Sequence, residues 1–359
     1  MLNNTIYRLK KEKSLRIGYF GGSITEGAGA TVWDETSWRG RINRYMKEMY
    51  PDAKITEIQA AIGGTGTDFG HCRCKHDLLS KNPQLVFIEF AVNDSDMSFQ
   101  DQMMYYESCL RQILMYDDTI DIICVFTATK RTETMICQTG DHSARSIQAT
   151  LAHYYSLPTV DLGDHMRRAV AFAGGDWLRY TTDETHPNDE GYIIYTEAMK
   201  QALSKMLSGD IPEKLTNKSV PSPLSPYPFT NGRMIELCEC EHTMNGFTFT
   251  DKPFKKRFPY YYKANGVGST IDFDFEGTGF GIYQIMDDHS GTVEISLDGE
   301  KPILISAWDS YCKSFSRAGY AFPFRGLENK HHRVHIRVSD KKDPESLGKD
   351  IAIFAFLVL

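Results

Sequence analysis

Short apolar runs alternate with amphipathic stretches over the first two hundred residues. Five runs rich in β-branched and aromatic residues predict strands at 16–20, 54–60, 85–90, 120–127 and 159–162. Apolar positions at helical spacing predict helices at 38–49, 68–80, 99–116, 142–155, 165–172 and 189–207. Strands that alternate with helices in this way indicate the α/β class, with a mostly parallel sheet covered by helices.

The pattern changes after residue 208. Residues 209–232 contain five prolines and little apolar periodicity, which is typical of a linker or a surface strap. Beyond it the period falls to two, in separate runs such as STIDFDF, GFGIYQI and GTVEISL, and Leu-Asp-Gly-Glu at 297–300 predicts a hairpin turn. We therefore expect an α/β domain at 1–208, a linker at 209–232, and an all-β sandwich of jelly-roll type at 233–359, built from about eight short strands.

Composition narrows the possible functions. A length of 359 residues suits two domains better than one. The net charge of −7, without a long basic run, argues against a nucleic-acid partner. The apolar runs are too short to span a membrane and the first twenty residues do not resemble a signal peptide, so we expect a cytoplasmic protein without membrane contact. Eight cysteines are too sparse for a disulfide scaffold, which fits reduced thiols. The sequence does not determine the oligomeric state, so a homo-oligomer stays an alternative.

A candidate nucleophile follows the first predicted strand, which ends in Gly21-Gly22-Ser23-Ile24-Thr25. Open α/β sheets bind ligands at the carboxyl ends of their strands, so Ser23 is well placed to react. A phosphate loop is excluded because no Gly-Lys-Ser/Thr follows, and a nucleophile elbow is excluded because Thr25 stands where it needs glycine. A helix-capping serine in a glycine-rich turn is the alternative.

Candidate oxyanion donors follow the next two strands. The second strand ends in Gly63-Gly64-Thr65-Gly66, whose amides are suited to donate to an oxyanion. A dinucleotide fingerprint does not fit, because Phe69 stands where the third glycine belongs. The third strand leads into Asn93, whose side-chain amide is a further donor. An Asn-Asp turn that caps a helix is the alternative for Asn93.

A candidate base lies before the last predicted helix, in Asp183-Glu184-Thr185-His186-Pro187. An aspartate three residues before a histidine is able to hold the imidazole while its other nitrogen faces a serine. In isolation this motif is as typical of a helix start with a surface histidine. The combination is more informative, since four segments deliver the residue types of one mechanism to the same edge of the sheet.

These motifs resemble the four blocks of the SGNH, or GDSL-type, hydrolases in order and spacing, over about residues 14–207. The resemblance implies a three-layer, flavodoxin-like α/β/α domain. It implies Ser23 as nucleophile, His186 as base and Asp183 as its partner, with the Ser23 amide, the Gly64 amide and the Asn93 side chain as the oxyanion hole.

Two positions depart from the family pattern. Gly22 replaces the aspartate of Gly-Asp-Ser, and Ala91 replaces a glycine usual two residues before the block-three asparagine. Neither departure removes a reacting group.

Within this superfamily the chain looks most like two-domain carbohydrate acetylesterases that act on hemicellulose, including acetylated mannan. That resemblance implies an acetylated oligosaccharide as substrate, no metal or organic cofactor, and a second domain similar to a carbohydrate-binding module. Two alternatives remain: a lysophospholipase or thioesterase-type acyl hydrolase using the same triad, and a non-catalytic glycan-binding protein.

Other chemically suggestive residues carry weaker signals. Trp177 and Trp308 are predicted to contact substrate because aromatic faces stack on sugar rings, with core packing as the alternative. A Cys-x-Cys-x-His spacing occurs at 72–76 and again at 238–242. Zinc sites usually have two or more residues between cysteines, so we interpret these as buried thiols and expect no metal site.

Overall fold

The computed structural model describes residues 1–140, 143–226, 231–254 and 258–359. The chain divides into two compact units, Met1–Thr230 and Asn231–Leu359. Residues 227–230 of the predicted linker and His142, the first residue of a predicted helix, lie outside the described residues.

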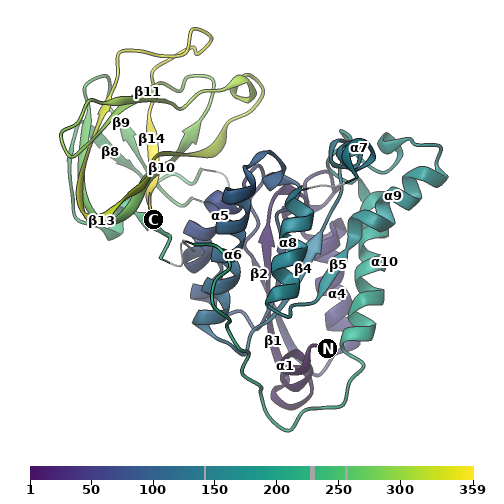
Figure 1. Cartoon of the computed structure of the whole chain (residues 1–359). Coiled ribbons are helices and arrows are strands. Elements are labelled where there is room, and N and C mark those ends of the chain that lie inside the picture. The colour runs from purple at the N-terminus through teal and green to yellow at the C-terminus, as the bar shows by residue number, and fades with distance from the viewer. Residues whose placement is uncertain (141–142, 227–230, 255–257) are drawn as a thin grey trace. The chain divides into compact units, whose positions relative to one another are not determined.

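A parallel sheet forms the centre of the first unit (Figure 1). Its strands lie in the order β2-β1-β3-β4-β5, each next to the strands expected for a flavodoxin-like sheet. Their bounds are β1 Ser14–Gly21, β2 Lys54–Gln59, β3 Leu85–Glu89, β4 Asp121–Phe126 and β5 Thr159–Asp161. The α/β prediction is therefore confirmed. Each observed strand begins and ends within two residues of the predicted bounds.

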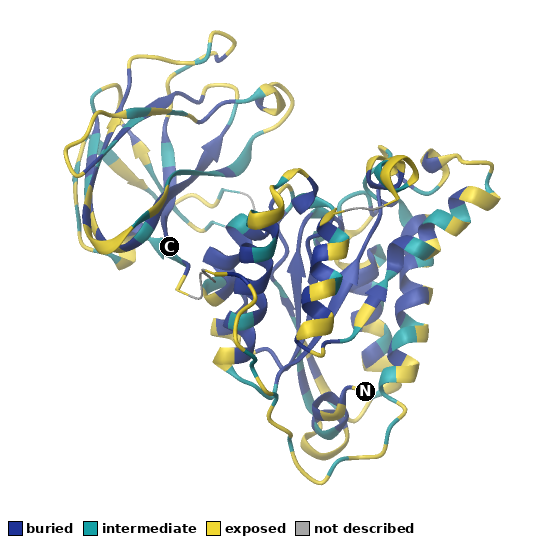
Figure 2. Ribbon diagram, viewed as in Figure 1, coloured by how far each residue is buried: buried dark blue, intermediate teal, exposed yellow. Residues whose placement is uncertain are grey.

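Helices cover both faces of this sheet. One face carries α4 Trp38–Met49, α9 Leu162–Phe172 and α10 Asp189–Met206; the other carries α5 Thr67–Arg73, α6 Phe99–Tyr116 and α8 Ser143–Tyr154. Successive strand residues point to opposite layers: Tyr19 packs in the core with Trp38, and Phe20 in the core beneath α6. Figure 2 shows the strands buried and the outer helix faces exposed.

Several short helical segments lie outside the predicted set. They are α1 Asn3–Tyr7, a π-helical turn Arg8–Glu12, α2 Ser23–Glu26, α3 Trp33–Thr36, α7 Lys130–Thr139, and 3-10 turns at Asn93–Asp96 and Trp177–Arg179. The helix predicted at 68–80 is α-helical only to Arg73; a π-helical turn Cys74–Leu78 and a 3-10 turn Leu79–Lys81 complete it.

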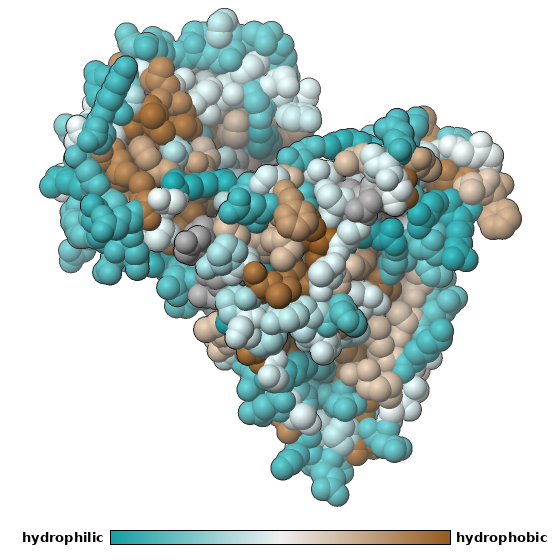
Figure 3. All heavy atoms as spheres, viewed as in Figure 1, coloured by the Kyte–Doolittle hydropathy of each residue, from teal (hydrophilic) through white to brown (hydrophobic). Residues whose placement is uncertain are grey.

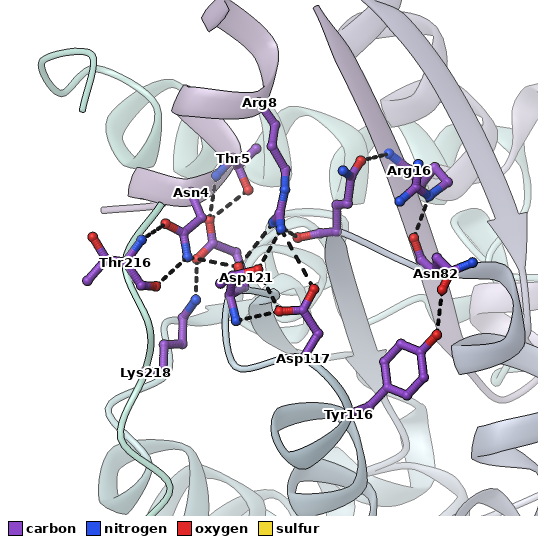
Figure 4. A network of polar contacts seen from close by, with 12 residues as sticks. Asn4, Thr5, Arg8, Arg16, Asn82, Tyr116, Asp117, Asp121, Thr216 and Lys218 are labelled. Carbon is purple, nitrogen blue, oxygen red and sulfur yellow. Dashed lines mark hydrogen bonds and ion pairs between the residues drawn. The ribbon is translucent and has the colours of Figure 1, made fainter. Parts of the chain in front are cut away.

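A polar network joins the start of the chain to the proline-rich segment at the amino ends of the strands (Figure 4). Asn4 bonds through its side chain to both the N–H and the carbonyl of Thr216, each at 2.8 Å. Asp121 accepts from the N–H and hydroxyl of Thr5 and pairs with Lys218 at 2.8 Å. The described part of the predicted linker is therefore a strap bound to the first unit along part of its length.

The second unit is all-β, as predicted, and its strands pair in antiparallel fashion. Its strands are β6 Arg233–Glu236, β7 His242–Asn245, β8 Phe247–Thr250, β9 Tyr261–Ala264, β10 Thr270–Met286, β11 Thr292–Leu297, β12 Ile303–Ser306, β13 Arg317–Val338 and β14 Ala352–Val358. Short 3-10 turns lie at Leu237–Glu239 and Ser310–Lys313. The jelly-roll arrangement stays a prediction.

Two strands of the second unit are much longer than expected. β10 has 17 residues and β13 has 22, and they pair with each other through register shifts near Gly277 and Phe280. The runs STIDFDF and GFGIYQI, predicted as separate strands, are therefore one strand. The predicted hairpin turn is present, with Asp298 and Gly299 at φ values of 52° and 80°, the left-handed pair of a type I′ turn.

The face in view in Figure 3 carries its hydrophobic residues in small patches among hydrophilic ones. Among the described residues, no helix is long and apolar enough to cross a membrane.

The cysteine prediction holds for one pair only. Cys72 and Cys74 are buried, whereas Cys238 is exposed and Cys240 half-buried, because Cys238 lies in the 3-10 turn after β6 and Cys240 directly follows that turn. Within the described ranges, no group of three or more His, Cys, Asp or Glu side chains is placed to hold a metal ion.

Candidate active site

Four segments that are distant in sequence meet at the carboxyl edge of the parallel sheet. Ser23 opens α2 immediately after β1, and Gly64 lies in the turn between β2 and α5. Asn93 opens the 3-10 turn after β3, and His186 lies in the loop before α10. The parallel strand order brings the four together, because successive strands end at the same edge.

The predicted nucleophile, base and acid form one hydrogen-bonded chain. His186 Nε2 lies 2.8 Å from Ser23 Oγ, and His186 Nδ1 lies 2.7 Å from Asp183 Oδ2. The other carboxylate oxygen of Asp183 accepts the backbone N–H of His186 at 2.8 Å and that of Thr185 at 3.1 Å. The carboxylate thus fixes both the imidazole ring and the loop that carries it, in the geometry of a Ser-His-Asp triad.

These contacts keep Asp183 ionised. Partial burial by itself raises the pKa of this carboxyl group, but the hydrogen bonds from His186 and Thr185 outweigh it and lower the pKa below its usual range. A charged Asp183 favours the imidazole tautomer that has its proton on Nδ1, which leaves Nε2 free to accept a proton from Ser23.

The loop of Asp183 and His186 is held by its neighbours. Glu184 adopts a left-handed conformation with φ of 64°, and its carbonyl accepts the N–H of Lys130 at the start of α7. On the other side, a Cβ at Gly29 would lie 2.4 Å from the carbonyl of Pro187 and 3.1 Å from the Cβ of His186. The loop after the nucleophile therefore packs directly against the base.

Tyr192 ties the nucleophile to α10. Its hydroxyl lies 2.7 Å from the carbonyl of Ala28 and 3.1 Å from that of Ile24, so it bridges the turn that follows Ser23. Since α10 begins right after the base loop, this contact fixes the two halves of the Ser23–His186 pair relative to each other.

Three hydrogen-bond donors around Ser23 are available to a substrate. The N–H of Ser23, at the first position of α2, has no partner within its helix. Among the residues that the structure describes, nothing accepts from the N–H of Gly64 or from the side-chain amide of Asn93. These are the three donors that the family resemblance assigns to the oxyanion hole, and an oxyanion would satisfy them.

Residues 63–67, which we call the glycine loop, pass close to the nucleophile. A Cβ at Gly63 would lie 3.4 Å from the Cβ of Ser23. Gly64 has φ of 71°, a left-handed conformation that favours glycine, and its missing Cβ would point into open space. The loop thus leaves room for a substrate beside Ser23.

A buried carboxyl group that sequence reasoning missed lies beneath the nucleophile turn. Glu89, at the end of β3, accepts the hydroxyl of Thr25 at 2.9 Å and that of Thr127 at 2.8 Å. Burial raises its pKa, opposed by these hydrogen bonds. The sequence does contain a sign of this group, since Glu89 is the single acidic residue within the apolar run LVFIEFAV.

A buried guanidinium supports the same turn and was also missed. Arg39, 1% exposed, donates to the carbonyls of Thr25 and Glu26, each at 3.2 Å, and pairs with Asp34 and Glu57. It therefore closes the end of the short helix that Ser23 begins.

The two predicted substrate-contacting tryptophans are both largely buried. Trp177 is 8% exposed and lies in the core shared by β1 and α10. Trp308 is 8% exposed and packs with Met286 and Cys312 in the second unit. The structure gives both a packing role, and their contact with substrate stays a prediction.

Part of the first unit resembles a known protein family. Residues 19–194 match the model of the GDSL-like Lipase/Acylhydrolase family. The search of curated proteins finds no match for the sequence.

Two solved structures resemble the whole chain. One is a two-domain esterase (CEX) active on acetylated mannans, with 23% identity, a TM-score of 0.84, and coverage of 100% of this chain and 95% of that one. The other is that type of esterase co-crystallized with mannopentaose, with 24% identity, a TM-score of 0.83, and coverage of 98% and 94%. At these identities the similarity establishes the two-domain fold.

Proposed function

Residues 19–194 belong to the GDSL-like lipase/acylhydrolase family, which makes this chain a carboxylic ester hydrolase, and we propose that it removes O-acetyl groups from carbohydrate. The observation that carries the proposal is the chain of contacts from Ser23 Oγ through His186 to Asp183, at 2.8 and 2.7 Å. Acetylated oligosaccharides of the hemicellulose type, mannan among them, are the proposed substrates.

The acylation step begins with proton transfer from Ser23 Oγ to His186 Nε2. Oγ attacks the carbonyl carbon of the acetyl ester, and the carbonyl oxygen takes up the negative charge. His186 then returns the proton to the departing sugar oxygen, which leaves acetyl-Ser23. Asp183 stabilises the imidazolium throughout, without accepting the proton itself.

The N–H groups of Ser23 and Gly64 and the side chain of Asn93 bind the oxyanion in this mechanism. They are polar groups fixed before the reaction, so they need little reorganisation when the charge develops. Water attacks the acetyl-enzyme in the second half of the reaction, with His186 again as base, and acetate leaves.

Two features support carbohydrate over lipid as the acyl carrier. The segments around Asn93 and His186, AVNDSDMS and TDETHPNDEG, are polar, which favours a hydrophilic substrate over a long acyl chain. The whole chain also shares its two-domain fold with an esterase described as active on acetylated mannans.

Acetate release tests the proposal. The substrates are acetylated manno- and xylo-oligosaccharides, beside p-nitrophenyl acetate and butyrate, for the wild type and Ser23→Ala. We expect rapid release from an oligosaccharide and a loss of at least about 10³-fold in Ser23→Ala. Cleavage of synthetic esters without release from any acetylated oligosaccharide would overturn the carbohydrate assignment, and faster cleavage of butyrate than acetate would favour a longer acyl chain.

A further inference from the structure

Two carboxylates outside the triad hold the two ends of the glycine loop. One comes from the segment that carries Ser23 and the other from the segment that carries Asn93. The loop itself carries Gly64, so the three segments that supply the proposed oxyanion donors are joined to one another by these two carboxylates.

The first carboxylate is that of Glu26. Its Oε2 accepts the backbone N–H of Gly63 at 2.7 Å. Glu26 ends the four-residue helix α2 that Ser23 begins, so a single helical turn separates the nucleophile from this anchor. The neighbouring peptide in the loop is the one whose N–H belongs to Gly64. Glu26 therefore fixes the start of the loop in register with the nucleophile.

The second carboxylate is that of Asp94, which directly follows Asn93. Its Oδ1 accepts the N–H of Thr67 at 2.8 Å, and its Oδ2 accepts the hydroxyl of Thr67 at 2.9 Å. A Cβ at Gly66 would lie 2.5 Å from Oδ1, so the loop backbone lies close against this carboxylate. Gln148 of α8 donates to Oδ2 at 2.8 Å and holds the aspartate from behind.

The glycine loop needs such anchors. Three of its five residues are glycines, which lose more conformational freedom on ordering than any other residue. The space beside Gly64 is open, so no packing from that side holds its peptide in place. An oxyanion donor lowers the barrier only if it already points at the developing charge.

We propose that Glu26 and Asp94 are positioning residues of the oxyanion hole: by accepting the N–H groups of Gly63 and Thr67 they aim the Gly64 amide at the site. This inference rests on the proposed function. Neither carboxylate touches the reacting atoms. Loss of either anchor leaves the triad intact and lowers the rate of the chemical step.

Paired substitutions separate the hydrogen bond from the charge. In Glu26→Gln the amide oxygen is still able to accept the Gly63 N–H, whereas Glu26→Ala removes the acceptor. Full burial raises the pKa of Asp94 to about 8, although the bonds from Thr67 lower it, so the neutral asparagine is a fair substitute. Asp94→Asn keeps an acceptor for the Thr67 N–H, and Asp94→Ala does not.

A matched control exists at the opposite edge of the sheet. Asp117 accepts the N–H of Thr119 at 2.8 Å and its hydroxyl at 2.6 Å, the pattern that Asp94 makes with Thr67. Asp117→Ala removes an acceptor of the same two kinds of donor far from the four catalytic segments, although Asp117 is half-buried and bonds a residue two positions away. It shows what loss of such a contact does to the protein in general.

The experiment measures kcat and KM for p-nitrophenyl acetate with the full chain and these variants, beside Ser23→Ala. We expect kcat to fall roughly tenfold to a hundredfold in Glu26→Ala and Asp94→Ala, part of the loss for a whole donor, with KM within about twofold. Glu26→Gln and Asp94→Asn should recover most of the rate, and Asp117→Ala should keep it.

Wild-type kcat in Glu26→Ala would overturn the proposal, as would a loss in Glu26→Gln equal to that in Glu26→Ala. Near-ultraviolet circular dichroism identifies variants that do not fold; if Asp94→Ala is one, the Glu26 pair decides the proposal. Full activity in Ser23→Ala would instead overturn the proposed function. An inactive Ser23→Ala beside an unimpaired Glu26→Ala overturns the positioning role alone.

Discussion

Gly22 lies directly against the side chain of Asn93: a Cβ built on Gly22 would be 1.9 Å from Asn93 Oδ1. The φ of Gly22 is −93°, which any residue adopts, so the constraint here is space and not backbone conformation. This explains the departure from Gly-Asp-Ser in the first block. An aspartate at this position would collide with Asn93 as it is placed in this protein.

Gly22→Ala should therefore displace Asn93. Loss of one oxyanion donor typically costs 10²–10³ in rate, and we expect a fall in kcat of about 10²-fold. The measurement is kcat on p-nitrophenyl acetate, with the thermal midpoint of unfolding recorded in parallel. Asn93→Ala is the control, and the double variant should be no slower than the slower single variant. Wild-type activity in Gly22→Ala would show that Asn93 does not need its present position.

Gly64→Ala tests the left-handed conformation of the glycine loop. The side chain would meet nothing within 4 Å, so any effect arises from the backbone at φ of 71°. Alanine in this conformation costs roughly 1–2 kcal/mol, which favours a different loop conformation. We expect kcat to fall tenfold or more, because the N–H of Gly64 would no longer point at the oxyanion.

Gly174 offers the matched control for this substitution. Its φ is 73°, a Cβ there would also meet nothing, and it lies after the end of α9. Gly174→Ala should lower the free energy of unfolding by a similar amount and leave kcat unchanged. Equal effects of the two substitutions on kcat would contradict a specific role for Gly64.

The lowered pKa of Asp183 predicts the acid side of the pH profile. An aspartate with a lowered native pKa stabilises the fold above its unfolded pKa of about 4, and this contribution is lost as the pH falls through the native value. Asp183 therefore stays ionised from about pH 5 upward, so its own protonation adds no second proton to the fall in activity above that pH. The logarithm of kcat/KM should fall with a slope of one proton, and a slope of two would contradict the assignment.

Glu107 should anchor the strap to the first unit. This buried carboxylate accepts the N–H of Leu224 and that of Ser225, each at 2.7 Å, and the hydroxyl of Tyr155 at 2.6 Å. Glu107→Ala leaves those groups unpaired, so amide hydrogen exchange at Leu224 and Ser225 should accelerate by at least about tenfold. Unchanged protection there would show that other contacts hold the strap.

Much of the first unit's fold is predictable because its apolar periodicity is strong. The helices at 38–49 and 99–116 end where the pattern ends. α7 escapes prediction because its buried residues, Thr132 and Glu133, are polar. α1 is missed for a similar reason, since two of its three buried residues, Asn4 and Thr5, are polar and hydrogen-bond to distant residues.

The long strand β10 shows another limit. Gly277 and Gly279 resemble a turn in the sequence, but a Cβ at Gly277 would lie 2.3 Å from the carbonyl of Leu359. These glycines let the end of the chain lie close to a continuous strand. That function depends on a residue about eighty positions away, which no local pattern reveals.

The candidate active site likewise contains residues that the sequence identifies and residues that only the tertiary structure reveals. Motif spacing is sufficient to identify the candidate site residues Ser23, Gly64, Asn93, Asp183 and His186. The structure brings them to one edge of the sheet. The residues that hold these groups, such as Glu26, Glu89 and Asp94, make their contacts across the fold. Their partners are set by tertiary packing, and sequence spacing does not show them.

Direct observation of the acyl-enzyme is the most direct test of Ser23 as the nucleophile. Wild-type protein mixed with an acetyl ester is quenched in acid within milliseconds to seconds, digested, and mapped by mass spectrometry, with Ser23→Ala as control. An acetyl-enzyme on Ser23 predicts one acetyl group, on Ser23, that appears before steady-state acetate release and is absent from Ser23→Ala. Turnover without acetylation of Ser23, or an acetyl group on another residue that turns over at the rate of acetate release, would contradict it.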